Sequence, residues 1–180
     1  MTRNVFERLN IRKRKVSAND TGKYQPGDFG YWWTVIEGKP DIEGQDYEGD
    51  IDCSYNKLTS LKGAPKYVGG RFYCENNKLT TLESAPEYVG GLFNCSNNRL
   101  TSLEGGPKTV DGYFNCSNNQ LTSLKGAPRE VRGTFNCSDN QLTSLEGAPR
   151  KVGDYFNCRG NNLTSLDGIG EVNGEIISDL

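Results

Sequence analysis

Six cysteines are the residues of this sequence whose type and spacing most readily suggest chemistry. Cysteine can bind a metal, form a disulfide or act as a nucleophile. The chain contains no histidine, which removes the commonest metal ligand and general base. We predict a ladder of buried, unpaired thiols without a metal or cofactor, with strained disulfides between neighbouring copies as the alternative. The cysteines recur at a constant spacing of 21 residues: Cys53, Cys74, Cys95, Cys116, Cys137 and Cys158.

An acidic run is the second candidate for chemistry. Asp46, Glu48, Asp50 and Asp52 occupy alternate positions, so one strand over this run would carry all four carboxylates on one side. Hard cations take clustered oxygen ligands, so a calcium site is one interpretation. We favour the alternative, a charged sheet edge that blocks pairing with other strands.

The remaining charge excludes some functions. No residue pattern pairs a nucleophile with a base, so we predict that the protein is not an enzyme. The net charge is −2, too small to favour nucleic acid or a membrane as the main partner, and no apolar run has the length of a membrane span. Residues 1–16 hold six basic groups and one acid, hence +5, and the other residues carry −7. Contact with nucleic acid is expected only at one short cluster: Arg12, Lys13, Arg14 and Lys15.

That basic arm has two further interpretations. It is either solvated or folded back onto the acidic segment 41–52.

Six unpaired thiols are typical of a reducing compartment, so we expect a cytoplasmic protein.

An internal repeat positions all of these residues. Around each cysteine recurs the frame F-x-C-x-x-N-x-L-T-S-L-x-G-A-P-x-x-V-G-G-x. Phe and Cys alternate with polar residues, which predicts a short strand with one buried face. The Asn side chain can satisfy backbone groups at the following bend, and Gly with Pro argues against a helix in the return segment. Because one copy cannot bury its own apolar face, stability must come from stacking.

The F-x-C-x-x-N-x-L run resembles the core of leucine-rich repeats, with Phe and Cys in two leucine positions. The N-x-L-T-S-L-x-x-x-P half resembles the short bacterial subtype, and the resemblance covers about residues 47–177. It implies an all-β-like repeat solenoid with a parallel sheet on the concave face and turns or extended chain on the convex side. The repeat sequence is also similar to repeats encoded by tailed phages. That resemblance implies an inhibitor of a host or antiviral-defence protein, acting in the host cytoplasm.

We divide the chain into three parts. Residues 1–46 form an N-terminal arm and cap, 47–167 the six repeats, and 168–180 a C-terminal cap. Within the first part we expect a short N-terminal helix over 2–9, a loop over 17–30 and a degenerate first coil over 33–40 with Trp33 in a leucine position. A last strand is expected near 175–178.

Binding is expected on the concave face, where the residues that flank Phe and Cys vary between copies. Tyr and Arg are typical anchors of protein interfaces, although Tyr is also a good strand former. The candidate partner-binding residues are Asp50, Asp52, Arg71, Tyr73, Glu75, Leu92, Tyr113, Tyr155 and Arg159.

The sequence therefore predicts a non-catalytic protein-binding module that occludes or sequesters a partner protein. The alternative is a structural or assembly protein, of a virion or scaffold, that associates through its coil ends and the basic arm. Neither the identity of the partner nor the oligomeric state follows from the residues.

Overall fold

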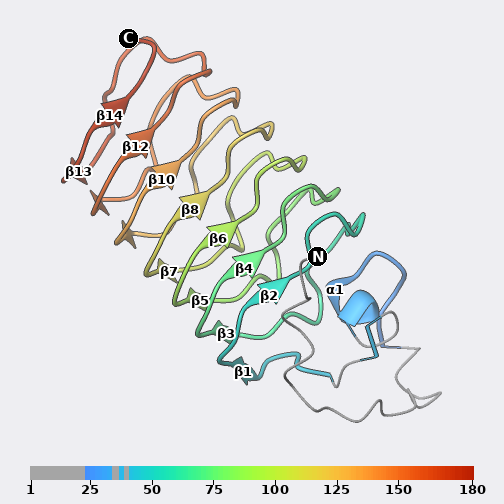
Figure 1. Cartoon of the computed structure of the whole chain (residues 1–180). Coiled ribbons are helices and arrows are strands. Elements are labelled where there is room, and N and C mark those ends of the chain that lie inside the picture. Colours follow the sequence, from blue (N-terminus) through green and yellow to red (C-terminus); the bar gives the residue numbers. More distant parts are fainter. Residues whose placement is uncertain (1–22, 34–36, 39–40) are drawn as a thin grey trace, which may run out of the picture.

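The computed structural model describes residues 23–33, 37–38 and 41–180. In this part the chain winds into a parallel β-solenoid, which confirms the predicted all-β repeat fold (Figure 1). Successive coils stack in a row that runs nearly straight in this view. Each coil contributes two short strands, one to each of two seven-stranded parallel sheets.

The first sheet, here called the Phe–Cys sheet, forms where the F-x-C alternation predicts it. Every strand pairs in register with its counterpart 20 or 21 residues along the chain, so that Phe93 lies beside Phe114. Its strands are β2 (Ile51–Asp52), β4 (Phe72–Tyr73), β6 (Phe93–Asn94), β8 (Phe114–Asn115), β10 (Phe135–Asn136), β12 (Phe156–Asn157) and β14 (Ile176–Ile177).

The second sheet, here called the Val sheet, lies in the return segment, which we expected to be only turns and extended chain. Each of its strands ends at a buried or half-buried position of the Val row, apart from β1, which ends at Tyr47. Its strands are β1 (Asp46–Tyr47), β3 (Tyr67–Val68), β5 (Tyr88–Val89), β7 (Thr109–Val110), β9 (Glu130–Val131), β11 (Lys151–Val152) and β13 (Glu171–Val172).

The core between the two sheets is a set of identical side chains stacked along the axis. Phe72, Phe93, Phe114, Phe135 and Phe156 are all fully buried, and neighbouring rings lie 5.3–5.8 Å apart between centroids. The leucines and valines of the interior coils are buried to the same degree. This regular stacking is how coils that are too small to fold alone bury a continuous apolar core.

A ladder of asparagines holds the bends together. Asn98 Nδ2 donates to the carbonyls of Cys95 in its own coil and Cys74 in the preceding coil, at 3.1 and 3.0 Å. Its Oδ1 accepts from the N–H of Leu79 at 2.9 Å. The same bonds recur at Asn77, Asn119, Asn140 and Asn161. The predicted role of the Asn side chain in satisfying the backbone is confirmed.

The six cysteines form the predicted ladder of buried, free thiols. Each Sγ lies against a main-chain carbonyl of the following coil; in the second coil, Cys74 Sγ donates to the carbonyl of Asn94 at 3.2 Å. Burial raises the pKa of the Cys74 and Cys116 thiols well above the usual range.

A short helix and an aromatic cluster cover the N-terminal end of the column. The helix α1 (Phe29–Tyr31) begins within the segment 17–30 that was expected to be a loop and ends one residue beyond it. The Phe29 ring stacks on Trp33 at 5.6 Å and reaches Phe72 at 6.1 Å, so it extends the core past the first coil. The predicted helix over 2–9 and most of the proposed degenerate coil lie outside the described residues.

The last strand lies where it was expected, as β14 at Ile176–Ile177. No helix among the described residues is long and apolar enough to cross a membrane.

Candidate protein-binding face

Two rows of side chains make up the outer face of the Phe–Cys sheet, here called the outer face. They alternate along each strand with the buried Phe and Cys, as the strand period requires. The first row differs between neighbouring coils, and the second is Asp, then Tyr, then Asn in the last four repeats, whereas the buried rows are nearly constant. The first row is Asp50, Arg71, Leu92, Tyr113, Thr134 and Tyr155, and the second is Asp52, Tyr73, Asn94, Asn115, Asn136 and Asn157.

Three tyrosines lie on this face, in the second, fourth and sixth repeats. Tyr73 is half-buried, and its hydroxyl accepts a hydrogen bond from Arg71 Nη1 at 3.4 Å. The Tyr113 hydroxyl accepts from Asn136 Nδ2 in the next coil at 3.0 Å. Tyr155 is 44% exposed. Two of the tyrosines are therefore held in position by neighbours, while the third presents its ring to solvent.

The asparagines of the second row are partly engaged within the protein. Asn94 Oδ1 accepts from the N–H of Ser96, and Asn115 Oδ1 accepts from the N–H of Ser117, both at 3.1 Å. Asn136 and Asn157 make the same Asx-type bond. Their Oδ1 atoms fix the bend after each strand. Asn136 Nδ2 donates to Tyr113, so the Nδ2 groups of Asn94, Asn115 and Asn157 are the donors offered to a partner.

The row directly after each cysteine, from which Glu75 and Arg159 were expected on this face, is buried at its centre. Ser96, Ser117 and Ser138 are only 4–7% exposed. Ser54 and Arg159 make the same Asx-type bond near the two ends of the stack but are more exposed, so the burial depends on having coils stacked on both sides.

Glu75 occupies that buried row where the central coils have serine. It is half-buried, and its Oε2 is enclosed by protein without a hydrogen-bond partner. Burial, and to a smaller extent the negative charge of Asp52, raises the pKa of the Glu75 carboxyl. Glu75 thus places an unsatisfied carboxylate at the N-terminal end of the outer face.

Asp50, Asp52 and Arg71 lie at the same end and are exposed. Asp50 Oδ1 accepts from the N–H of Arg71 at 2.7 Å, and Asp52 Oδ1 accepts from the hydroxyl of Ser54 at 2.6 Å. These carboxylates therefore accept hydrogen bonds near the first coil as well as adding charge to the face.

The idea that the acidic run follows one strand is wrong. Asp46 belongs to β1 in the Val sheet, whereas Asp52 belongs to β2 in the Phe–Cys sheet, and the chain bends around Gly49 between them. In the described part of the chain, no three Asp, Glu or Cys side chains are grouped so that they could hold a metal ion.

The start of the acidic segment 41–52 contacts Lys23 and Tyr24. Lys23 Nζ lies 2.6 Å from Asp41 Oδ2 and 2.8 Å from Glu43 Oε2, and Tyr24 Oη donates to Asp41 Oδ1 at 2.8 Å. The basic cluster at 12–15 lies outside the described residues.

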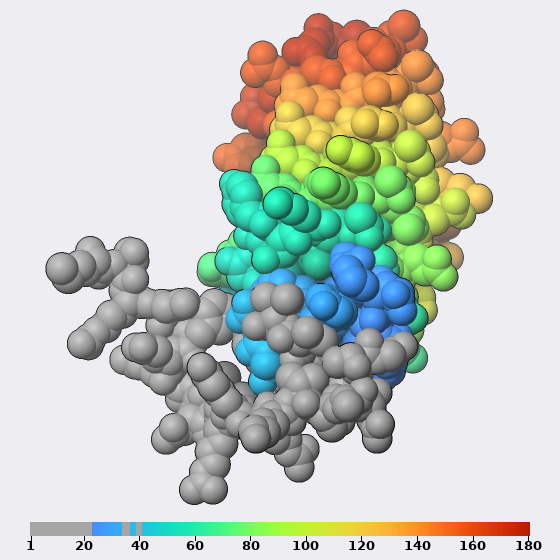
Figure 2. All heavy atoms as spheres, turned by 90° about the vertical axis from the view of Figure 1, so that its right-hand side faces the viewer, coloured from blue at the N-terminus to red at the C-terminus, as the bar shows by residue number. Residues whose placement is uncertain are grey.

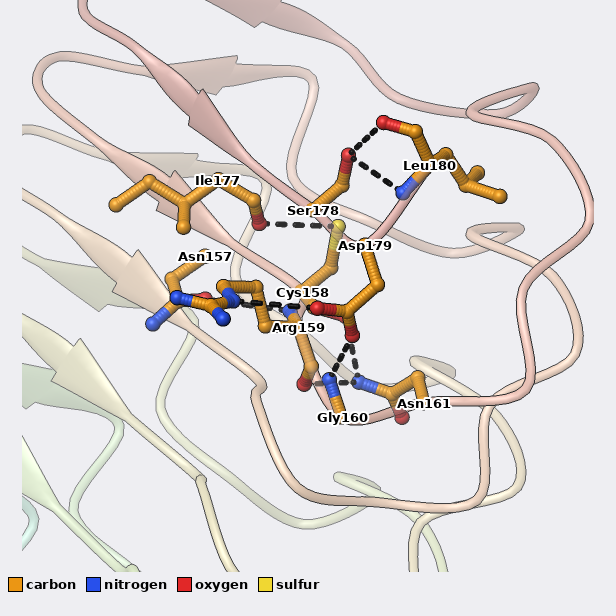
Figure 3. A network of polar contacts seen from close by, with 9 residues as sticks. All are labelled: Asn157, Cys158, Arg159, Gly160, Asn161, Ile177, Ser178, Asp179 and Leu180. Atoms are coloured by element: carbon orange, nitrogen blue, oxygen red, sulfur yellow. Dashed lines mark hydrogen bonds and ion pairs between the residues drawn. The ribbon is translucent and has the colours of Figure 1, made fainter.

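Arg159 lies at the opposite, C-terminal end of the face and is exposed (Figure 3). Its Nε lies 3.2 Å from Asp179 Oδ1, and Asp179 Oδ2 accepts from the N–H of Gly160 at 2.5 Å. The Asp179 carboxylate thus takes the place that a main-chain carbonyl of a following coil has elsewhere, as for Asp139 N–H on Arg159 O.

A groove of about 830 Å³ lies away from the tyrosines, at the corner formed by the G-A-P turns. Pro65, Pro107 and Pro128 line it, together with Lys108 and Arg129. The repeat places these residues at equivalent positions in successive coils, and they form no nucleophile–base pair.

Comparisons of the chain with protein-family models, with curated proteins and with solved structures gave no match. The leucine-rich-repeat family remains an expectation drawn from the repeat pattern, and an account of function has to start from the outer face itself.

Proposed function

We propose that this protein is a non-catalytic protein-binding module that uses the outer face to occlude or sequester a partner protein. The observation that carries the proposal is the contrast between rows. The core rows repeat almost unchanged through the coils, while the first outer row carries Asp, Arg, Leu, Tyr and Thr, and the second begins with Asp and Tyr before four Asn residues. Residues that only hold the coils together can be the same in every coil. Variety among the residues of one face therefore supports recognition of a specific surface.

The three tyrosines are the proposed anchors. Protein interfaces concentrate their binding energy in a few aromatic and Arg residues near their centre. Tyr113 lies in the central part of the stack, and its ring is positioned by the bond to Asn136. Leu92, half-buried in the neighbouring coil, adds apolar area beside it. A partner that buries these rings would gain apolar burial without ordering long flexible side chains.

A non-catalytic role is supported by the state of the cysteines. The thiolate is the reactive form of cysteine, and burial keeps these thiols protonated by raising their pKa. The resemblance to phage repeats adds a narrower proposal. The partner would be a protein of the bacterial host or of its antiviral defence, met in the host cytoplasm.

Quantitative capture from bacterial lysate, followed by titration of the captured protein in purified form, tests the proposal. The face variant carries Tyr73→Ala, Tyr113→Ala and Tyr155→Ala. The control variant carries Tyr55→Ala, Tyr67→Ala and Tyr88→Ala, because Tyr55 is 73% exposed on a bend and the other two lie on the Val sheet. Both variants lose three tyrosine rings. The control also loses the stacking of Tyr67 on Tyr88 at 4.7 Å and the hydrogen bond that Tyr88 donates to Asp111, so thermal melts of both variants accompany the binding measurement.

We expect a protein that wild type and the control variant capture equally and that the face variant loses. The dissociation constant of the purified partner should rise at least about 100-fold for the face variant, since each anchor contributes upward of 1 kcal/mol. Equal affinity of all three proteins for every captured partner would refute the proposal.

A further inference from the structure

The two ends of the column differ. At the N-terminal end, α1 and the rings of Phe29, Trp32 and Trp33 cover the first coils, and all three rings are buried. At the C-terminal end, the corresponding core residues lie partly in solvent. Figure 2 shows the last coil at the extremity of the column, opposite the segment that contains α1.

The exposure of this end is apolar. Ile176 lies in register with Phe156 but is 37% exposed, whereas Phe156 is fully buried. The leucines and the valine of the last coil are only half-buried, although their counterparts one coil earlier are fully buried. These half-buried residues are Leu163, Leu166 and Val172.

The backbone of this end is also open. Phe135 N–H donates to the carbonyl of Tyr155, and Phe156 N–H donates to that of Glu175. The N–H at the same position of the last coil belongs to Ile176, and no strand in the described part of the chain follows it. A sheet edge with unpaired groups and apolar neighbours is a template for an added strand.

Charge determines what fits this edge. Residues 160–180 contain four acids and no basic residue: Asp167, Glu171, Glu175 and Asp179. Glu171 and Asp179 are paired with Lys151 and Arg159 of the preceding coil, at 3.6 and 3.2 Å. Two such ends would bring eight carboxylates together, so the end is unsuited to pair with itself. Residues 1–16 carry +5 and interleave that charge with Val5, Phe6 and Leu9. They have both the charge and the apolar side chains that the end lacks.

We propose that the C-terminal end of the column binds residues 1–16 of a second copy, so that the protein associates head to tail. The distances favour a second copy over the chain's own arm. The six strand spacings from β2 to β14 amount to about 29 Å. The eight residues from Lys15 to Lys23 span at most about 29 Å when fully extended, and Lys23 lies at the far end, beyond the first coil.

Sedimentation velocity of the full chain, over a range of concentrations at about 50 mM and 500 mM salt, tests the proposal. The arm variant carries Glu at positions 12–15 in place of Arg12, Lys13, Arg14 and Lys15. The end variant carries Glu171→Lys and Glu175→Lys. A control variant carries Glu83→Lys and Glu146→Lys, which make the same charge change at exposed positions of interior coils.

We expect the weight-average mass of wild type and control to rise at least twofold above the 19.9 kDa monomer at low salt, and to fall at high salt, which screens exposed charges. The arm and end variants should each stay monomeric alone. Mixed together they should associate, because the end variant keeps the basic arm and the arm variant keeps the acidic end. A monomeric wild type at all concentrations, association that both variants retain, or a mixture that stays monomeric would overturn the proposal.

Discussion

At the scale of single residues, the asparagine at each bend stabilises the stack through the hydrogen bonds of its side chain. The amide of Asn98, for example, joins two coils through four backbone atoms: three carbonyls that accept from its Nδ2 and one N–H that donates to its Oδ1. Removing the side chain strands a buried N–H, and leaving such a group unsatisfied costs about 1–3 kcal/mol.

Asn119→Ala should therefore lower the free energy of unfolding by about 3 kcal/mol, because the variant loses the bonds to two cysteine carbonyls and strands the N–H of Leu100. Urea denaturation measures the change. Gln120→Ala, at the exposed next position of the same coil, is the control and should change stability by less than about 0.5 kcal/mol. Similar losses for the two variants would contradict the role of the ladder.

Glu75 is expected to behave in the opposite way to Asn119, because removing its charge should stabilise the protein. Its pKa is raised in the folded protein, so folding favours the protonated form, and the carboxylate costs stability once the pH exceeds the pKa of the unfolded chain. Glu75→Gln should therefore stabilise the protein at pH 7, by up to about 1 kcal/mol, and make no difference near pH 3.5. Thermal unfolding at both pH values measures this.

The matched control is Glu83→Gln, the same chemical change at an exposed position, which should leave stability unchanged at either pH. A loss of stability at pH 7 in Glu75→Gln would mean that the carboxylate has a stabilising partner, and would contradict the claim that its burial costs stability.

The sequence alone predicted these asparagines and cysteines well, since identical residues at one spacing must stack in register. It placed Glu75 and Arg159 alike on an open face, whereas Glu75 is half-buried and Arg159 is exposed. Burial of the row they share depends on the place of each coil in the stack, which the residue types alone do not show.

At the scale of elements, the strands are only two residues long, so pairing with neighbours on both sides holds them. A strand in the middle of the stack has two such neighbours and β14 has one. The cost of truncating a core residue should depend on its coil more than on its type.

Ile51 and Ile176 occupy equivalent positions at the two ends, with Ile51 fully buried and Ile176 37% exposed. Ile51→Ala should cost about 2–4 kcal/mol, and Ile176→Ala about 1 kcal/mol or less, because little new cavity forms at an open end. Phe114→Ala, in the middle of the stack, should cost about 3–5 kcal/mol. Equal costs in denaturant melts for the two isoleucines would contradict stacking between nearest neighbours.

The sequence predicted the Phe–Cys strands because alternation with a period of two is visible even over three residues. It missed the Val sheet, because one buried Val in each coil shows no alternation and a glycine, which is typical of a turn, lies within two residues after each strand. It also placed the acidic run on one strand, because the bend at Gly49 leaves the alternation of acids intact in the sequence. The helix α1 escaped prediction because three residues show no helical period.

At the scale of the whole molecule, the repeat separates stability from recognition. The inner rows and the asparagine ladder hold the column together, so the first outer row is free to vary without loss of the fold, while the Asn residues of the second also fix the bends. The same regularity creates two ends with different surfaces, one covered by aromatic rings and one acidic and apolar. We propose the outer face for binding to another protein and the C-terminal end for association between copies.

The affinity of a purified partner for the wild type, the Tyr73/Tyr113/Tyr155 triple alanine variant and the Tyr55/Tyr67/Tyr88 control tests the central claim most directly. Calorimetric titration should give equal dissociation constants for wild type and control, and a constant at least about 100-fold higher for the face variant. Thermal melts of all three proteins should coincide within a few degrees. A well-folded face variant that binds as tightly as wild type would contradict the claim that the outer face is the binding surface.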